Sequence, residues 1–334
     1  MGKYDIAVCK FLSDNDRFAE LVNASEFGGR SVLRGDMLRP DDNRYVALCE
    51  GGAQKDGQVH FKQRFRDIKK RTKSGDWIVI TAIENQENID YNMPLRMMEY
   101  DLLEYGAQVR AIKKDKAKFV QESGKVPCNW NARLMKQDKI HPVHSICFYH
   151  GIEPWDGPRS LKDMMDFEGA PPGWEELFHD YGMSLFCAGE IEDLSVFQTG
   201  LRQFLEVIPL RKNRKKLVEL WNQEEYRHLD RDTAEVIAVL TDCTTVLERL
   251  DDYEKEGEYD MCQAMNEWRE ELLEEGKLQG IEQGIEQGIE QGIGQESLRS
   301  IQSIMTTLKL NIDQAMEALM IPESDRDNYR AMIN

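Results

Sequence analysis

The chain has 334 residues, of which 41% are hydrophobic and 31% are charged, and its formal net charge is −18. This length is enough to bury a substantial core and to form two or more units. No apolar run approaches the roughly 18 residues that span a bilayer, and the amino terminus lacks the apolar segment of a signal peptide. These features argue against a membrane-spanning or secreted protein, and we expect a cytoplasmic one.

The cysteines and histidines give no sign of a zinc site or a disulfide framework. Seven cysteines are scattered between Cys9 and Cys262, and none forms a C-x-x-C pair. Such a pattern indicates reduced, mostly buried thiols. His141 and His144 lie on either side of Pro142, which interrupts a helix, so a shared zinc site there is not expected.

The first predicted element is a helix over residues 16–23. Phe18, Leu21 and Val22 recur at helical spacing and form its apolar stripe. Glu20 lies off the centre of that stripe, where a glutamate is usually solvated.

An acid pair is predicted on the next two elements. Residues 77–83 are rich in β-branched and aromatic side chains and follow a turn signal at 74–76, as a strand would. Residues 63–70 precede that turn, so the two segments predict a hairpin with Asp67 and Glu84 close together. Because carboxylates repel unless a cation lies between them, and because Mg²⁺ takes one or two carboxylates plus phosphate oxygens, the pair predicts a Mg²⁺ site.

A third polar residue follows on the same strand. Gln86 shares the face of Glu84 because strand side chains alternate. It is therefore placed to orient a water that attacks a phosphodiester bound at a metal ion. The alternative is an ordinary hairpin with polar residues on its solvent face, and spacing alone does not separate the two interpretations.

Basic residues flank the acids despite the negative net charge. Seven cations lie between residues 61 and 73, and further clusters occupy 113–118 and 211–216. Since affinity for DNA comes largely from neutralising phosphates, these clusters favour a DNA partner. The predicted DNA-binding residues are Arg64, Arg66, Lys69, Lys70 and Arg96. A solvated surface cation is the alternative for each of them.

The remaining elements are mainly helical. A helix is expected over residues 94–107, with Leu95, Met98, Leu102 and Tyr105 on its buried face. Residues 143–149 are apolar and predict a buried strand. From residue 194 to about 270 the apolar pattern is helical and contains no comparable acid pair, which indicates an extension packed on the core rather than a second enzyme.

A four-residue repeat marks the tail. Glycine recurs at 276, 280, 284, 288 and 292, mostly within Gly-Ile-Glu-Gln units. On a helix the isoleucines would form a slowly winding stripe, but each interior glycine costs about 1 kcal/mol relative to alanine. We expect a conditional helix that is stabilised by pairing with another copy, with a flexible spacer as the alternative. A helical hairpin follows, with Asp313 as the predicted cap of its second helix.

Several segments resemble the recombination-promoting nuclease and transposase family of the PD-(D/E)xK nuclease superfamily. The resemblance extends over most of the chain and includes the repeat. The segments that carry it are Asp16-Arg17-Phe18-Ala19-Glu20-Leu21-Val22-Asn23, Arg64-Phe65-Arg66-Asp67, Ile83-Glu84-Asn85-Gln86, Tyr91-Asn92-Met93-Pro94-Leu95-Arg96, Tyr100-Asp101, Cys147-Phe148-Tyr149-His150-Gly151 and Trp155-Asp156-Gly157-Pro158-Arg159-Ser160-Leu161.

The resemblance implies an α/β fold with a mixed sheet flanked by helices, and the helical pattern from residue 194 adds a helical C-terminal extension to it. It also implies a divalent metal and cleavage of DNA. Carried over to this chain, Asp67 and Glu84 are the metal ligands, Glu20 is a further candidate ligand from the first helix, and Gln86 stands where many superfamily members have lysine. Glutamine offers hydrogen bonds but no charge, so the reaction would depend more heavily on the metal.

Three functions follow from the sequence, in order of preference. The first is a Mg²⁺-dependent DNA endonuclease connected with recombination or mobile elements. The second is a catalytically weak DNA-binding or assembly protein that keeps the nuclease fold. The third is a strand-joining transposase, for which we find no separate acid triad. The expected division is a nuclease-like domain over 1–190, a helical extension over 191–275, a repeat spacer over 276–295 and a helical hairpin over 296–334.

Overall fold

The computed structural model describes residues 2–42, 44–49, 60–74, 77–123 and 134–333, with side chains at 44–49, 60–65, 74 and 77 left aside. The chain divides into two compact units, Met1–Asn266 and Glu267–Asn334. The helices of residues 201–248 belong to the same unit as the sheet. The finer four-part division stays a prediction.

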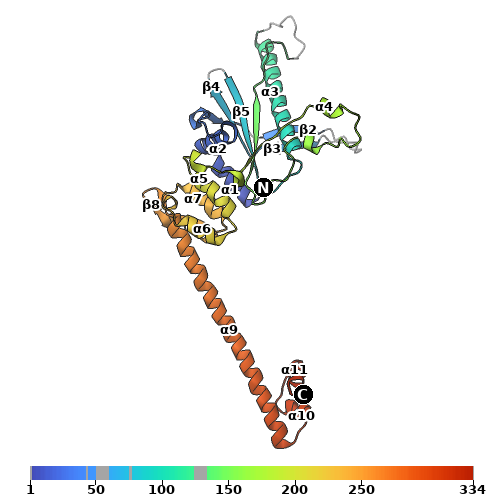
Figure 1. Cartoon of the computed structure of the whole chain (residues 1–334), viewed down its shortest axis with the longest axis vertical. Helices are drawn as coiled ribbons and strands as arrows, with labels where there is room; N and C mark the ends of the chain where they lie inside the picture. The colour runs from blue at the N-terminus through green and yellow to red at the C-terminus, as the bar shows by residue number, and fades with distance from the viewer. Residues whose placement is uncertain (1, 43, 50–59, 75–76, 124–133, 334) are drawn as a thin grey trace. The chain divides into compact units, whose positions relative to one another are not determined.

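A five-stranded mixed sheet forms the centre of the first unit (Figure 1). Its order is β1 (Leu38–Pro40), β4 (Ile68–Ser74), β5 (Trp77–Gln86), β6 (Val143–Tyr149) and β7 (Ser184–Cys187). The first three strands pair antiparallel, whereas β5, β6 and β7 run parallel. The α/β class and the mixed sheet are therefore confirmed.

A separate antiparallel pair, β2 (Arg44–Cys49) and β3 (His60–Phe65), precedes β4. The predicted strand over residues 63–70 is thus divided between two sheets. Phe65 ends β3, Ile68 begins β4, and Asp67 lies in the bend between them.

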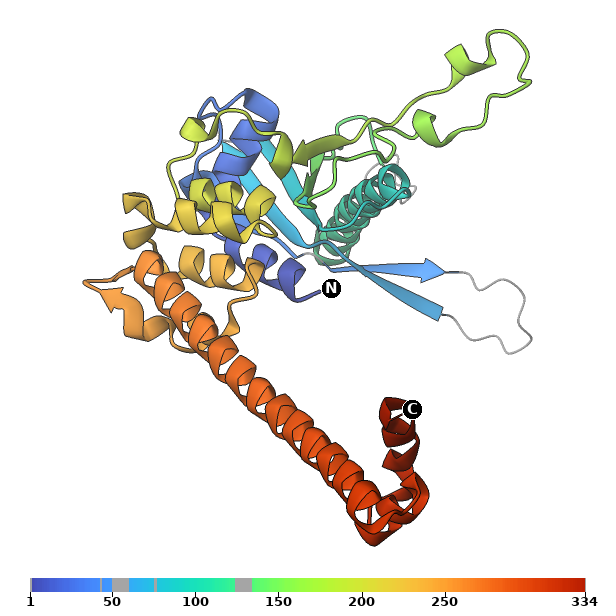
Figure 2. The same ribbon diagram turned by 60° about the horizontal axis from the view of Figure 1, so that its bottom comes forward.

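Helices cover both faces of the five-stranded sheet (Figure 2). The long helix α3 (Met93–Ser123) crosses from β5 to the parallel strand β6, and its Met93 and Met97 pack with Cys147 and Tyr149 of β6. The opposite face is covered by α1 (Lys3–Leu12), α2 (Asn15–Phe27) and α5 (Leu201–Val207). There Phe204 of α5 lies between Phe11 and Phe148, with ring centroids 4.8 and 6.2 Å away.

The predicted buried face of α3 is wrong for three of its four residues, since only Tyr105 is half-buried. Leu95, Met98 and Leu102 are exposed, and the helix instead buries Met93, Met97, Tyr100, Asp101 and Glu104. Asp101 and Glu104 can be buried because Asp101 pairs with Arg66 and Glu104 pairs with Lys69.

One of these buried ion pairs joins four parts of the unit. Arg66 donates to Asp101 Oδ1 at 2.5 Å and also to the hydroxyl of Ser145 on β6. The same carboxylate accepts hydrogen bonds from Ser145 at 2.5 Å and from Tyr181 at 2.6 Å. The network ties the connection between β3 and β4 to α3, β6 and the segment before β7.

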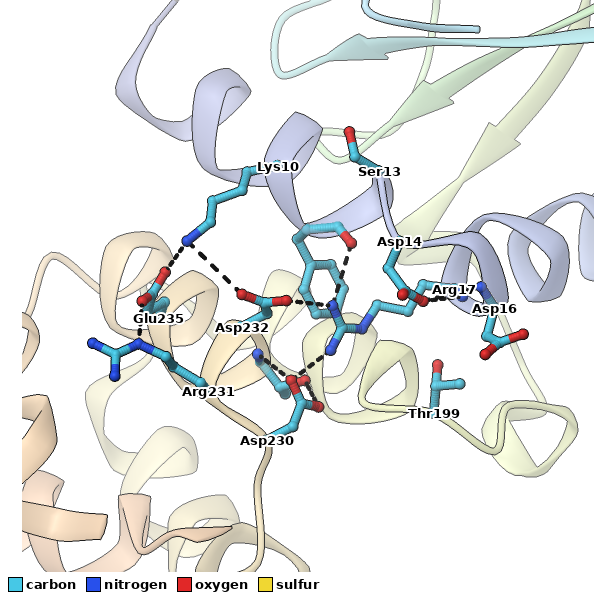
Figure 3. Close-up of polar contacts among 12 residues, drawn as sticks. Lys10, Ser13, Asp14, Asp16, Arg17, Thr199, Asp230, Arg231, Asp232 and Glu235 are labelled. Atoms are coloured by element: carbon cyan, nitrogen blue, oxygen red, sulfur yellow. Dashed lines mark hydrogen bonds and ion pairs between the residues drawn. The ribbon is translucent and has the colours of Figure 1, made fainter. Parts of the chain in front are cut away.

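A second polar network fastens the helical extension to the amino-terminal helices (Figure 3). The extension includes α6 (Arg214–Trp221), α7 (Arg231–Leu240) and α8 (Thr244–Glu248). Arg17 of α2 contacts Asp230 at 2.5 Å and Asp232 at 3.3 Å, and its guanidinium lies over the ring of Phe11. Lys10 of α1 pairs with Glu235 of α7. The extension is therefore part of the support for α1.

The second unit contains the repeat. Helix α9 (Met261–Leu308) is continuous through all the glycines, and α10 (Ile312–Ala318) and α11 (Glu323–Ile333) follow it. Ile301, Ala315 and Met316 form the small core of this unit. Asn311, rather than the predicted Asp313, caps α10, because its side chain accepts from the backbone N–H of Gln314 while the Gln314 side chain accepts from the N–H of Asn311.

The repeat face of α9 is exposed within this unit. Ile281, Ile285, Ile289 and Ile293 are each more than half exposed. Pairing of this face with another copy stays a prediction. Among the helices that the structure describes, none has both the length and the apolar character needed to cross a bilayer.

Alanine at Gly280, Gly284 and Gly288 tests the helix directly. A Cβ at any of these positions meets no atom of the described chain within 4 Å, so we expect slower hydrogen exchange across α9, corresponding to about 1 kcal/mol of added stability per substitution. Gly257→Ala is the control and should destabilise, because Gly257 has a φ of +89°. Unchanged exchange in the repeat would contradict a helix there, and a simultaneous loss of self-association would identify the glycine face as a contact surface.

Candidate functional site

The register of β4 and β5 brings the two predicted acids together. Ile68 pairs with Ile83, so the preceding residue, Asp67, comes opposite Glu84. The backbone N–H of Asn85 donates to Asp67 Oδ2 at 2.8 Å, which fixes the carboxylate at the end of the strand pair. Alternation and the tight connection are thus enough to produce the convergence.

Glu84 is the most constrained of the site residues. Its side chain is 0% exposed, and its Oε2 lies 3.4 Å from Nη2 of Arg96. Its Oε1 is buried and has no hydrogen-bond partner in the part of the chain that the structure describes. Burial, together with the charge of Asp67, raises the pKa of Glu84 to about 8, although Arg66 and Arg96 oppose the shift.

Asp67 is less enclosed. Burial raises its pKa above the ordinary value, while the N–H of Asn85 and the charge of Arg96 act in the opposite direction. Only one carboxylate of the pair can therefore ionise easily, since a second negative charge in the same place is disfavoured.

Arg96 and Gln86 border the pair on the α3 side. Arg96, in the first turn of α3, is 27% exposed and divides its guanidinium between Glu84 and Asp90, the latter at 3.5 Å. Gln86 is half-buried two residues beyond Glu84, and its carbonyl accepts the N–H of His150 at 2.9 Å. Its side chain shares the Glu84 face by strand alternation.

The sequence pattern does not reveal a cluster of polar side chains that lies beneath α1. The amide of Asn85 donates to the carbonyl of Asp5 at 3.3 Å and lies 3.9 Å from the sulfur of Cys9. His150 is fully buried, and burial together with Arg211 lowers its pKa to about 4, so it is neutral. Asp5 and Cys9 are four residues apart on α1, which places them on one helix face, but only the tertiary fold sets that face against β5.

Glu20 does not join the pair. Its carboxylate accepts the N–H of Gln198 at 2.9 Å and the hydroxyl of Thr199 at 2.7 Å, in the loop before α5. This placement contradicts its predicted role as a metal ligand. Glu20 instead satisfies exposed donors of that loop, as a capping residue does.

The predicted basic rim is also wrong for three of its residues. Arg66, Lys69 and Lys70 are buried. Lys69 pairs with Glu104 at 3.0 Å, and Lys70 donates to Asn15 at 2.6 Å. Their charges are used inside the fold and are not available to a DNA backbone.

The correction for Arg66, Lys69 and Lys70 does not apply to the other two predicted DNA-binding residues, Arg64 and Arg96. The side chain of Arg64 lies outside the described residues. Arg96 remains partly exposed beside Glu84.

No family model, no curated protein and no solved structure matches the chain. Among the described residues, no group of three or more histidine, cysteine, aspartate or glutamate side chains is arranged to hold a metal ion.

The pKa of Glu84 predicts how stability depends on pH. Because the folded state keeps a proton on Glu84 up to about pH 8 while the unfolded state loses it near the ordinary glutamate pKa of 4.5, stability is fully present below that value and falls as pH rises toward 8. The slope is at most about 1.4 kcal/mol per pH unit. Glu84→Gln should remove this slope. Urea unfolding in EDTA from pH 5 to 9 checks it, and parallel profiles of the two proteins would contradict the shift.

Arg66→Met tests whether that arginine is structural. Removing one partner of a buried ion pair leaves the other charge uncompensated, so we expect a loss of about 3 to 5 kcal/mol in the free energy of unfolding. Lys113→Met, at an exposed position on α3, should change it by no more than about 0.5 kcal/mol. If both variants have the wild-type free energy of unfolding in urea, the buried ion pair of Arg66 does not stabilise the fold.

Proposed function

We propose that this protein is a divalent-cation-dependent DNA endonuclease of the PD-(D/E)xK type, connected with recombination or mobile elements. The observation that carries the proposal is the pair of Asp67 and Glu84, with a buried Glu84 oxygen that has no partner in the described structure. Such an oxygen needs a proton or a cation. The mixed sheet, with its acids at the end of two adjacent strands, agrees with the fold that the sequence resemblance implies.

The donor set fits a hard cation. Mg²⁺ prefers oxygen ligands, commonly takes one or two carboxylates, and completes its shell with water and substrate phosphate. Asp67 and Glu84 would hold it, and a third protein carboxylate is not required. A cation bound there supplies charge stabilisation for the phosphodiester and lowers the pKa of a coordinated water.

The neighbouring residues have separate tasks in this proposal. The amide oxygen of Gln86 accepts a hydrogen bond from a water and so orients it toward the phosphorus. Arg96 keeps Glu84 in place in the absence of substrate, and its exposed edge can donate to a phosphate oxygen. The side chains beneath α1, with Asn85 among them, hold the end of β5 so that the acids keep their positions.

The alternative is a DNA-binding or assembly protein without appreciable catalysis. The ion pair between Arg96 and Glu84 favours this alternative, because the guanidinium already neutralises the Glu84 carboxylate that a metal ion would bind. The two functions differ in whether substrate and cation displace that arginine.

Nicking of supercoiled plasmid in Mg²⁺ separates the two. We expect Asp67→Ala and Glu84→Ala to reduce the rate by about 100-fold or more, since each removes charge stabilisation from the reacting phosphate. Glu20→Gln is the matched control and should keep wild-type activity. EDTA should stop the reaction. Equal nicking by the two alanine variants would show that the activity comes from another site or a contaminant.

Gln86→Lys probes the water-orienting role in the same assay. If Gln86 acts through a hydrogen bond to water, lysine should preserve or raise the rate, because its charge can stabilise a hydroxide. Total loss of activity in a protein with an unchanged melting temperature would instead assign Gln86 a packed hydrogen bond.

A further inference from the structure

Arg211 has a buried donor with no acceptor among the described residues. The residue follows the short helix Ile208–Leu210 and precedes α6, and its side chain is only 8% exposed. Its Nη2 lies 3.2 Å from Glu87, whereas its Nη1 is buried and has no hydrogen-bond partner in the described part of the chain. A buried charged group left partly unsatisfied is costly, so Nη1 points to a missing acceptor.

A cavity adjoins this guanidinium. It has a volume of about 450 Å³, and Arg211 lines it together with Lys212, Tyr4, Glu87 and Tyr149. Tyr149 ends β6 and Glu87 directly follows β5, so the cavity lies at the carboxyl ends of two parallel strands. Ligands of open α/β sheets commonly bind at that edge.

The acids of the cavity are largely occupied. Glu87 is paired with Arg211, and Asp242 accepts hydrogen bonds from Lys3 and from Tyr4, the latter at 2.6 Å. Glu153 is solvent-exposed. An anion that enters the cavity could therefore accept a hydrogen bond from Nη1 of Arg211.

Free cations continue from the cavity. Lys212, Arg214, Lys215 and Lys216 are exposed, and none of them has an ion pair among the described residues. This distinguishes them from Arg66, Lys69 and Lys70, whose charges are used internally. Closely spaced, exposed cations are the arrangement that neutralises neighbouring phosphates of a strand.

We propose that Arg211 and the cavity beside it hold a backbone phosphate of DNA, and that Lys212, Lys215 and Lys216 contact the phosphates that follow. We call this group the Arg211 site. The inference rests on the proposed function in that it places the bound strand beyond the acid pair. Glu87, the ion-pair partner of Arg211, follows the end of β5 three residues after Glu84, so the Arg211 site lies at the same edge of the sheet as the acid pair.

Fluorescence anisotropy with a short labelled duplex in EDTA tests the exposed cations. In the triple variant Lys212→Gln/Lys215→Gln/Lys216→Gln we expect Kd to rise at least about tenfold, and the slope of log Kd against log salt to fall by about three. The matched control, Lys136→Gln/Lys139→Gln/Lys277→Gln, removes the same charge from exposed positions outside the clusters predicted to bind DNA and should leave both quantities nearly unchanged. Equal effects of the two triple variants would overturn the proposal.

Glu87 separates a phosphate contact from a structural ion pair. Glu87→Gln should tighten DNA binding, since Nη2 is released for the phosphate. The double variant Arg211→Gln/Glu87→Gln removes both charges of the ion pair, so no uncompensated buried charge destabilises its fold. It also lacks the phosphate donor, so its Kd for the duplex should be higher than that of the wild type. Recovery of wild-type Kd in the double variant would overturn the role of Arg211. Inorganic phosphate that binds the wild type without competing with the duplex would likewise overturn the assignment to DNA.

Plasmid nicking keeps this proposal separate from the endonuclease. If the wild type nicks DNA but the triple variant binds the duplex normally, the Arg211 site is wrong and the endonuclease stands. If the triple variant loses affinity but the wild type never nicks, the endonuclease is wrong and the phosphate site stands.

Discussion

A carboxylate with no access to solvent, placed beside a second carboxylate, cannot carry its charge unless a cation is near. Glu84 is under this constraint, and the surrounding structure follows from it. Asp67 is fixed opposite it by the N–H of Asn85, and Arg96 reaches it from the first turn of α3. The end of β5 is consequently less stable than a fully apolar strand end would be, and the rest of the unit supplies the rigidity that keeps it folded.

That rigidity comes from polar contacts on both faces of the sheet. On one face, Arg66 and Asp101 secure α3 to β4 and β6. On the other, Arg17 and Lys10 bind α1 and α2 to α7, and α1 in turn covers Asn85 and His150. The helical extension thus has a clear physical task in the same unit as the acids. It holds the layer against which the site strand packs.

The sequence was sufficient for features that depend on local pattern. The strand ending at Gln86, the buried strand ending at Tyr149 and the opposition of Asp67 and Glu84 all follow from alternation, apolar content and a short turn. Features that depend on long-range pairing were not accessible. A lysine that pairs inside the fold looks the same in sequence as one at the surface, so Lys69 and Lys70 appeared to be DNA contacts. For the same reason the helix face with Asp101 and Glu104 appeared to be solvated.

The repeat of α9 allows the length of the chain to vary. Its four-residue units are nearly identical, a Cβ at any of its glycines would meet no neighbouring atom of the described residues, and no buried hydrophobic residue in the described chain lies within 276–295. Gain or loss of one four-residue repeat, as replication slippage would produce, therefore preserves the helix, the cap at Asn311 and the packing within each of the two compact units. Related chains can be expected to differ in the number of these units more readily than in the length of any other helix.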